Sequence, residues 1–151
     1  VEVCAATKNI YSMLIGASEG LSSEDQNDEI KNKYYLNTAA SLFYKAVSEM
    51  KNLTKKLNGK PDTAYGLAGL GDLHVSSAGG RNSKMGFYLG KGHTFKDAKA
   101  KFMKEITVEG ADLAFAIGPK ILKEFDKKEF PLLLSMIECI CNNEKLKIDW
   151  K

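Results

Sequence analysis

The chain has 151 residues, of which 44% are hydrophobic and 27% are charged, a balance typical of one globular domain and not of a disordered chain. The formal net charge of +3 is too small to indicate nucleic acid as a partner. No apolar run approaches the roughly 20 residues of a membrane-spanning helix, and no signal-peptide pattern opens the chain. We therefore expect a cytoplasmic protein with neither nucleic acid nor membrane as a partner.

The three cysteines indicate reduced thiols. Cys139 and Cys141 form a C-x-C pair, but the sequence offers no second pair and no nearby histidine. Cys4 stands alone at the other end of the chain. Because this spacing fits no metal-ligand pattern, we expect buried thiols in a cytosolic protein and no metal site.

The first half of the chain is predicted to be helical, beginning with a helix over residues 2–18. Residues 22–33 are polar and lack periodicity, which predicts a loop or an insertion. Apolar side chains at intervals of three and four residues then mark a long helix over residues 36–57. Between residues 58 and 92, glycines interrupt the pattern, so we expect short helical pieces in a functional segment.

The second half of the chain returns to helical patterns. Thr94 and Asp97 have capping-box spacing, which predicts a helix from Thr94 toward Met103. Apolar residues between 113 and 125 predict another helix, and Pro131 stands at the first turn of a helix over residues 131–141. No period-two strand is present in the sequence pattern, so the predicted fold is all-α, with one domain over residues 1–151.

The segment from Gly66 to Asn82 carries the most chemically informative pattern. It opens as G-x-x-G-x-G, whereas a dinucleotide-binding turn reads G-x-G-x-x-G and follows a hydrophobic strand. The chain is therefore predicted to contain no nucleotide-binding fold. The segment closes with GGRN (residues 79–82), directly before a predicted helix over residues 83–89. Glycine backbone, a guanidinium and a helix N-terminus together suit a phosphate, although the residue types alone fit a solvated surface turn equally well.

Arginine usage singles out one member of this segment. Of the 22 basic residues, Arg81 is the only arginine. Surface lysine and arginine often replace each other, but a bidentate phosphate contact requires the planar guanidinium fork. The position of the sole arginine inside the glycine-dense segment therefore points to Arg81 as an anion ligand.

The motifs resemble those of a known family. GLAGLGDL (residues 66–73) followed by GGRN (residues 79–82) is similar to the signature of the C-terminal domains of NAD-dependent glycerol-3-phosphate dehydrogenases. VEVCAATKN (residues 1–9) and VEG (residues 108–110) resemble two further segments of that family, in the same order. The resemblance covers nearly the whole chain and implies the all-helical fold that these domains share with 6-phosphogluconate dehydrogenase C-terminal domains.

The resemblance also implies roles for individual residues. Lys8 would be the general acid and base at the C2 oxygen of the substrate, and Asp72 would pair with Lys8 and hold the substrate. Ser76, which stands where the family commonly has threonine, would contact the substrate as well. Further implied contacts are Gly80, Arg81 and Asn82 at the substrate phosphate, and Arg81, Thr107 and Glu109 at the cofactor.

The implied activity is hydride transfer between NAD and C2, which interconverts sn-glycerol 3-phosphate and dihydroxyacetone phosphate. NAD would be bound mainly by an N-terminal Rossmann domain that this chain lacks, so we expect the chain alone to be inactive. A homodimer is also expected. The sequence departs from the family in residues 22–35, which resemble an insertion, and at His74, to which we assign no catalytic role.

Two other interpretations are consistent with parts of the pattern. One is the helical domain of a related two-domain hydroxy-acid dehydrogenase, against which the GGRN phosphate segment argues. The other is a non-enzymatic helical module that binds phosphate or nucleic acid. That module would need a basic face with interleaved aromatic side chains, whereas the lysines of this chain are scattered.

Overall fold

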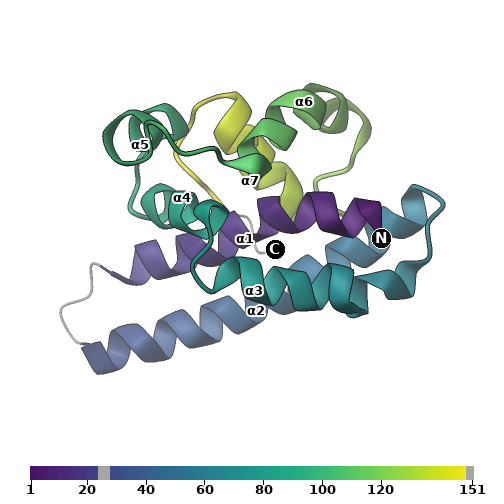
Figure 1. Ribbon diagram of the computed structural model, residues 1–151, viewed down its shortest axis with the longest axis horizontal. Helices are drawn as coiled ribbons and strands as arrows, with labels where there is room; N and C mark the ends of the chain where they lie inside the picture. Colours follow the sequence, from purple (N-terminus) through teal and green to yellow (C-terminus); the bar gives the residue numbers. More distant parts are fainter. Residues whose placement is uncertain (24–27, 149–151) are drawn as a thin grey trace.

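A computed structural model describes residues 1–23 and 28–148, the side chains of residues 28–35 excepted. Within this part of the chain the structure contains helices and no strand, which confirms the predicted all-α class. The helices pack around the N-terminal one, α1, as Figure 1 shows. In chain order the elements are α1 (Glu2–Ser22), α2 (Asp28–Lys56), the 3-10 helix η1 (Pro61–Tyr65), the π-helix η2 (Leu67–Gly71), α3 (Asp72–Ser77), α4 (Arg81–Gly90), α5 (Phe95–Phe102), α6 (Glu109–Glu124) and α7 (Pro131–Cys141).

The loop or insertion predicted over residues 22–33 is wrong as a loop at Ser22, which ends α1, and from Asp28 onward, where α2 has begun. Residues 24–27 lie outside the described part of the chain. The prediction depended on an apolar stripe, which starts only near Leu36. Helix α2 extends beyond that stripe through polar residues that are compatible with a helix, so periodicity could not reveal its first turns.

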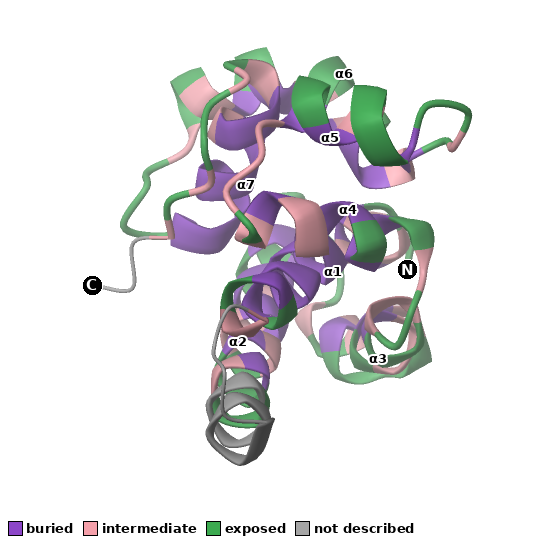
Figure 2. Cartoon of the chain, turned by 90° about the vertical axis from the view of Figure 1, so that its left-hand side faces the viewer, coloured by how far each residue is buried: buried purple, intermediate pink, exposed green. Residues whose placement is uncertain are grey.

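Helix α1 is the central element and contacts α2, α3, α4, α6 and α7. Its residues are buried without interruption from Ile10 to Ser18, so no solvent-facing stripe remains in the middle of the helix. A helix that is apolar on all sides belongs in the interior of a fold. Figure 2 shows α1 in the middle of the molecule, with α5 and α6 on one side of it and α2 on the other.

The contact between α1 and α4 is made by glycines. A β-carbon at Gly16 would overlap the carbonyl oxygen of Ser83, and one at Gly86 would overlap that of Met13. The pattern repeats one turn later, where Gly20 and Gly90 meet the opposite backbone. Because the contacts advance in the same direction along both helices, α1 and α4 are parallel and touch backbone to backbone.

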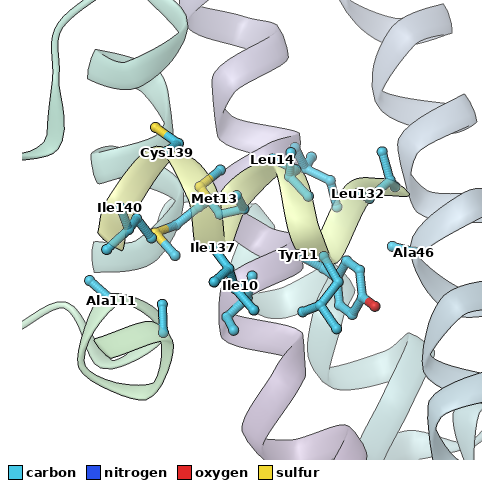
Figure 3. Packing of buried hydrophobic residues seen from close by; sticks show 14 of the residues in the cluster. Ile10, Tyr11, Met13, Leu14, Ala46, Ala111, Leu132, Ile137, Cys139 and Ile140 are labelled. Atoms are coloured by element: carbon cyan, nitrogen blue, oxygen red, sulfur yellow. The ribbon is translucent and has the colours of Figure 1, made fainter. Parts of the chain in front are cut away.

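The contact of α1 with α2 and α7 is made instead by large side chains. Figure 3 shows Ile10, Tyr11, Met13 and Leu14 of α1 among residues of α7 such as Ile137, all of them buried. One charged group lies inside this core. Glu49 of α2 is only 1% exposed, and its carboxylate contacts the N-terminus of α7.

Glu49 caps the N-terminus of α7. Its carboxylate accepts the backbone N–H groups of Leu132 and Leu133, both at 2.9 Å, and the hydroxyl of Tyr11 at 3.3 Å. The first N–H groups of a helix have no partner within that helix, so a carboxylate from another helix satisfies them. Burial raises the pKa of Glu49, although the two backbone hydrogen bonds act in the opposite direction.

Candidate functional site

The first half of the candidate site joins α1 to α3. The ammonium group of Lys8 donates to Oδ2 of Asp72 at 2.5 Å. Asp72 is the first residue of α3, and it directly follows the π-helix η2, so its backbone N–H is already bonded within the preceding turn. The Lys8 side chain is 18% exposed and that of Asp72 is 42% exposed. The pair is therefore held in place while one side stays open to solvent.

The glycine-rich segment that leads to this pair is not a loop. Gly66 ends η1, and the following residues form the π-helix η2, which runs directly into α3. Gly69 is buried against the backbone of Ala64 in η1. The glycines of this stretch thus serve close helix packing, and Asp72 is positioned by the helices on either side of it.

The double glycine before Arg81 makes the turn from α3 into α4. Gly79 has a φ of +142°, a conformation that side chains rarely permit. A β-carbon at Gly80 would lie 2.9 Å from the carbonyl oxygen of Ser76. Glycine is therefore favoured at residue 79 by the backbone conformation, and at residue 80 because the carbonyl of Ser76 leaves little room for a β-carbon. Their turn brings Arg81 to the first position of α4, two residues earlier than the predicted start of that helix.

The second half of the candidate site joins α4 to α6. Arg81 pairs with Oε1 of Glu109, the first residue of α6. Asn82, only 6% exposed, donates to Oε2 of Glu109 at 3.2 Å and accepts the N–H of Gly110 at 2.8 Å. Both polar atoms of the Asn82 amide are therefore used to fix the N-terminus of α6.

The parallel packing of α1 and α4 brings the two halves to the same end of the molecule. Lys8 lies near the N-terminus of α1, and Arg81 begins α4. Helix α1 also contacts α3 and α6, which start at Asp72 and Glu109. The N-terminus of α6 lies against Asn9 of α1, next to Lys8, and the first turn of α4 lies against Gly16. Two helix N-termini, those of α4 and α6, therefore lie against α1, and helix N-termini favour an anionic ligand.

Two predicted site residues take no part in these ion pairs and hydrogen bonds. Ser76 is half-buried in α3, and Thr107 is exposed just before α6. Neither hydroxyl makes a hydrogen bond within the part of the chain that the structure describes. Their predicted contacts with substrate and cofactor stay predictions. His74 is exposed, with its ring 6.1 Å from that of Phe43.

The candidate site is an open face and not an enclosed cavity. Arg81 is 59% exposed, whereas a cavity of about 540 Å³ lies near the C-terminal ends of α1 and α4, lined by residues such as Ala17 and Leu89. That cavity is apolar and lies at the opposite ends of these two helices from Lys8 and Arg81. The chemistry of the ionic groups, and not the depth of a pocket, identifies the site.

Metal-site and membrane features are missing from the described residues. Over residues 1–23 and 28–148 no three His, Cys, Asp or Glu side chains gather as a metal would require. In the same residues, every helix is too short or too polar to cross a membrane. The cysteines are free thiols. Cys4 and Cys139 are buried, as predicted, whereas Cys141 is only half-buried. Burial, with a smaller effect of the Glu144 charge, raises the pKa of Cys139 to about 12, so this thiol is unreactive at neutral pH.

Reasoning from the sequence missed the buried carboxylate of Glu49. It stands within the apolar stripe of α2, between Ala46, Met50 and Leu53, and an acidic residue in such a stripe is a signal that could have been followed. The pairing of Arg81 with Glu109 had no comparable signal, since the two residues are 28 positions apart and on different helices.

Comparison with known proteins bears on this geometry. The family described as NAD-dependent glycerol-3-phosphate dehydrogenase C-terminus matches residues 1–149. The NADP(+)-dependent glycerol-3-phosphate dehydrogenase of Archaeoglobus fulgidus is 34% identical over 125 residues, which cover 80% of this chain and 36% of the relative. The NAD(P)+ glycerol-3-phosphate dehydrogenase of Clostridium acetobutylicum is 32% identical over 145 residues, 95% of this chain and 39% of the relative.

Solved structures give the same result. Glycerol-3-phosphate dehydrogenase from Coxiella burnetii superposes with a TM-score of 0.72 and 27% identity, over 95% of this chain and 40% of that one. The enzyme from Saccharomyces cerevisiae has a TM-score of 0.74 at 20% identity, over 95% of this chain and 38% of that one, and shows the fold alone. This chain therefore spans between 36% and 40% of the length of these four proteins.

Fold and relatives together define the chain as an all-helical domain of the kind found in glycerol-3-phosphate dehydrogenases. More narrowly, the chain belongs to the family of NAD-dependent glycerol-3-phosphate dehydrogenase C-terminal domains. Family membership favours the first of the three interpretations drawn from the sequence. The roles of the individual site residues stay predictions.

Proposed function

We propose that this domain binds the phosphorylated substrate and moves the proton in the interconversion of sn-glycerol 3-phosphate and dihydroxyacetone phosphate. The observation that carries the proposal is the common location of an ion-paired lysine, Lys8, and the sole arginine, Arg81, at one end of two parallel helices. An acid–base group and a phosphate ligand on a single rigid face suit a small phosphorylated hydroxy compound.

In the reducing direction, the ammonium group of Lys8 donates a proton to the C2 oxygen as the carbonyl becomes an alcohol. In the oxidising direction, the neutral amine accepts that proton. Asp72 holds Lys8 in position, and Arg81 orients the phosphate so that C2 lies beside Lys8. A bound nicotinamide cofactor, NAD or NADP, would supply or accept the hydride at C2, with Thr107 and Glu109 on the cofactor side.

We also propose that an N-terminal nucleotide-binding domain is the main partner of this face. Large apolar side chains are exposed on the segment that contains Asp72, among them Leu67, which is 84% exposed, and Val75. Exposed apolar groups of this kind commonly mark an interface between domains. We place the reaction in the cytoplasm, and association into a homodimer stays a prediction.

The test joins the chain to the nucleotide-binding domain of a relative and compares the wild type with Arg81→Lys. Lysine keeps the charge but loses the planar fork, so we expect kcat/KM for dihydroxyacetone phosphate to fall by about 30- to 1000-fold, equivalent to roughly 2–4 kcal/mol. Lys84→Arg, three residues further along α4 on an exposed position, should change kcat/KM little. Equal activity of wild type and Arg81→Lys would show that the phosphate assignment is wrong.

A phosphate-free substrate separates two roles of Arg81. The wild-type fusion should reduce dihydroxyacetone poorly, and Arg81→Lys should barely reduce that activity further. A loss of the same size for both substrates would mean that Arg81 shapes the site or contacts the cofactor, and not the phosphate.

A further inference from the structure

Each cation of the candidate site already has a carboxylate partner within the domain. Lys8 is paired with Asp72, and Arg81 is paired with Glu109. These four charges sum to zero. An incoming phosphate therefore meets a neutral group of side chains, in which the guanidinium that suits it best is already in use.

Three features stabilise the carboxylate of Glu109 in its position. One carboxylate oxygen faces Arg81, and the other accepts a hydrogen bond from Asn82 at 3.2 Å. Glu109 is also the first residue of α6, where the helix favours negative charge. The same asparagine accepts the N–H of Gly110 at 2.8 Å, so the start of α6 and the carboxylate are fixed together.

The two contacts of Glu109 differ in accessibility. Asn82 is buried, whereas the Arg81 side chain is largely exposed. Ion pairs at exposed sites are weak and open easily, while a buried amide with both polar atoms satisfied is costly to disturb. Arg81 can therefore turn away from Glu109 while Asn82 and the start of α6 keep the carboxylate where it is.

We infer that Glu109 is a resident competitor of the substrate phosphate for Arg81. Phosphate binds by taking the guanidinium from Glu109, which stays beside the site on Asn82 and repels the bound dianion. The carboxylate thus weakens phosphate binding twice, through the pair that is lost and through the repulsion that follows. This inference rests on the proposed function, because it takes Arg81 as the phosphate ligand.

The test is a titration of the 151-residue chain with inorganic phosphate and with glycerol 3-phosphate, followed by calorimetry or by amide chemical shifts. Glu109→Gln keeps a hydrogen-bond acceptor for Asn82 but removes the charge. We expect the dissociation constant to fall about 10-fold, the effect of removing one nearby charge from a solvent-accessible site. Since the effect is electrostatic, it should shrink as the ionic strength rises.

Asp112 gives a matched control. It lies in the same first turn of α6 and is exposed, so Asp112→Asn removes the same charge from the same helix end without touching the pair. We expect its effect to be clearly smaller than that of Glu109→Gln. Equal tightening by both variants would overturn the inference, because it would reduce Glu109 to a general contribution to the surface potential.

Arg81→Gln separates failure of this inference from failure of the proposed function. If wild-type binding requires Arg81 but Glu109→Gln does not tighten it, Glu109 is no competitor, and the proposed function stands. If no variant shows Arg81-dependent binding, both are wrong. Circular dichroism establishes that each variant is helical, and Glu109→Ser provides a second neutral replacement if Glu109→Gln does not fold.

Discussion

Helix α1 contacts α4 in one way, and α2 and α7 in the opposite way. Toward α4 it presents glycines, and the two backbones touch without side chains between them. Toward α2 and α7 it presents Tyr11, Leu14 and other large side chains, with one carboxylate, Glu49, buried among them. The contact with α4 requires positions without side chains, whereas the contact with α2 and α7 requires particular side chains.

This difference predicts two kinds of sensitivity. Backbone atoms cannot move aside as a side chain can, so the glycine contact should tolerate no added volume. The side-chain contact can adjust to changes in volume, but each N–H group that Glu49 satisfies depends on its charge and its acceptors. Substitutions at the two contacts should therefore differ in the size of their effect and in its dependence on pH.

The largest effect is expected at the glycine contact. In Gly86→Ala the new β-carbon would overlap the carbonyl oxygen of Met13, and α1 and α4 must separate along their whole contact. We expect a loss of about 4 kcal/mol or more in the free energy of unfolding, which is a large part of the stability of an ordinary domain. Thermal unfolding followed by circular dichroism measures it.

Gly66→Ala is the control for this substitution. There the nearest atom to the new β-carbon is the carbonyl oxygen of Thr63 at 3.5 Å, an ordinary contact, and φ is −85°. The free energy of unfolding should change by less than about 1 kcal/mol. If Gly86→Ala were equally mild, the backbone contact between α1 and α4 would not be as close as described.

The second effect concerns Glu49→Gln at the side-chain contact. The amide has one acceptor oxygen where the carboxylate has two, so one of the N–H groups of Leu132 and Leu133 loses its partner. We expect a destabilisation of about 2 kcal/mol near neutral pH. Urea unfolding of both proteins measures it, and a change below about 0.5 kcal/mol would contradict the capping role.

The same pair of proteins tests the pKa of Glu49. Burial raises this pKa above the ordinary value of 4.5. A raised pKa means that the folded protein binds a proton more tightly than the unfolded one, so the associated stability is fully present below pH 4.5 and is lost as the pH rises through the raised value. The stability of wild type relative to Glu49→Gln should therefore decrease over that range, and a constant difference would contradict the raised pKa.

The smallest effect is expected away from both contacts of α1. Helix α5 packs against α4, and its first turn is capped by Thr94, whose hydroxyl accepts the N–H of Asp97. Thr94→Ala should cost about 1 kcal/mol, the usual value of such a cap. Urea unfolding detects this change, and Ser41→Ala on the exposed side of α2 provides a comparison that should be close to zero.

The contrast between the two contacts also explains what the sequence could predict. Helices with an apolar stripe, such as the one over residues 36–57, follow from periodicity because burial selects one face. The first turns of α2 lie beyond such a stripe and were missed. The glycine contact was missed as well, although Gly16 and Gly20, and Gly86 and Gly90, each stand one helical turn apart.

The candidate site was predictable through its motifs more than through its residue types. Lys8 and Asp72 were expected together from the family resemblance, and the structure places them in contact. The expected role of Asn82 at the phosphate stays a prediction, and the hydrogen bonds of its amide between α4 and α6 were not expected. Contacts of this kind join helices that are far apart in the chain, so they depend on how the helices pack and cannot be read from local sequence.

The glycine contact between α1 and α4 has a consequence for the length of compound that the proposed site would accept. With no side chain between the two backbones, the separation of the main chains that carry Lys8 and Arg81 is set by the van der Waals radii of main-chain atoms. Repacking elsewhere in the core would alter the stability of the domain before it altered that separation. If Lys8 and Arg81 act as proposed, the rigid contact between α1 and α4 limits how far apart the hydroxyl carbon and the phosphate of a bound compound can be, and a longer or shorter compound would meet only one of the two side chains.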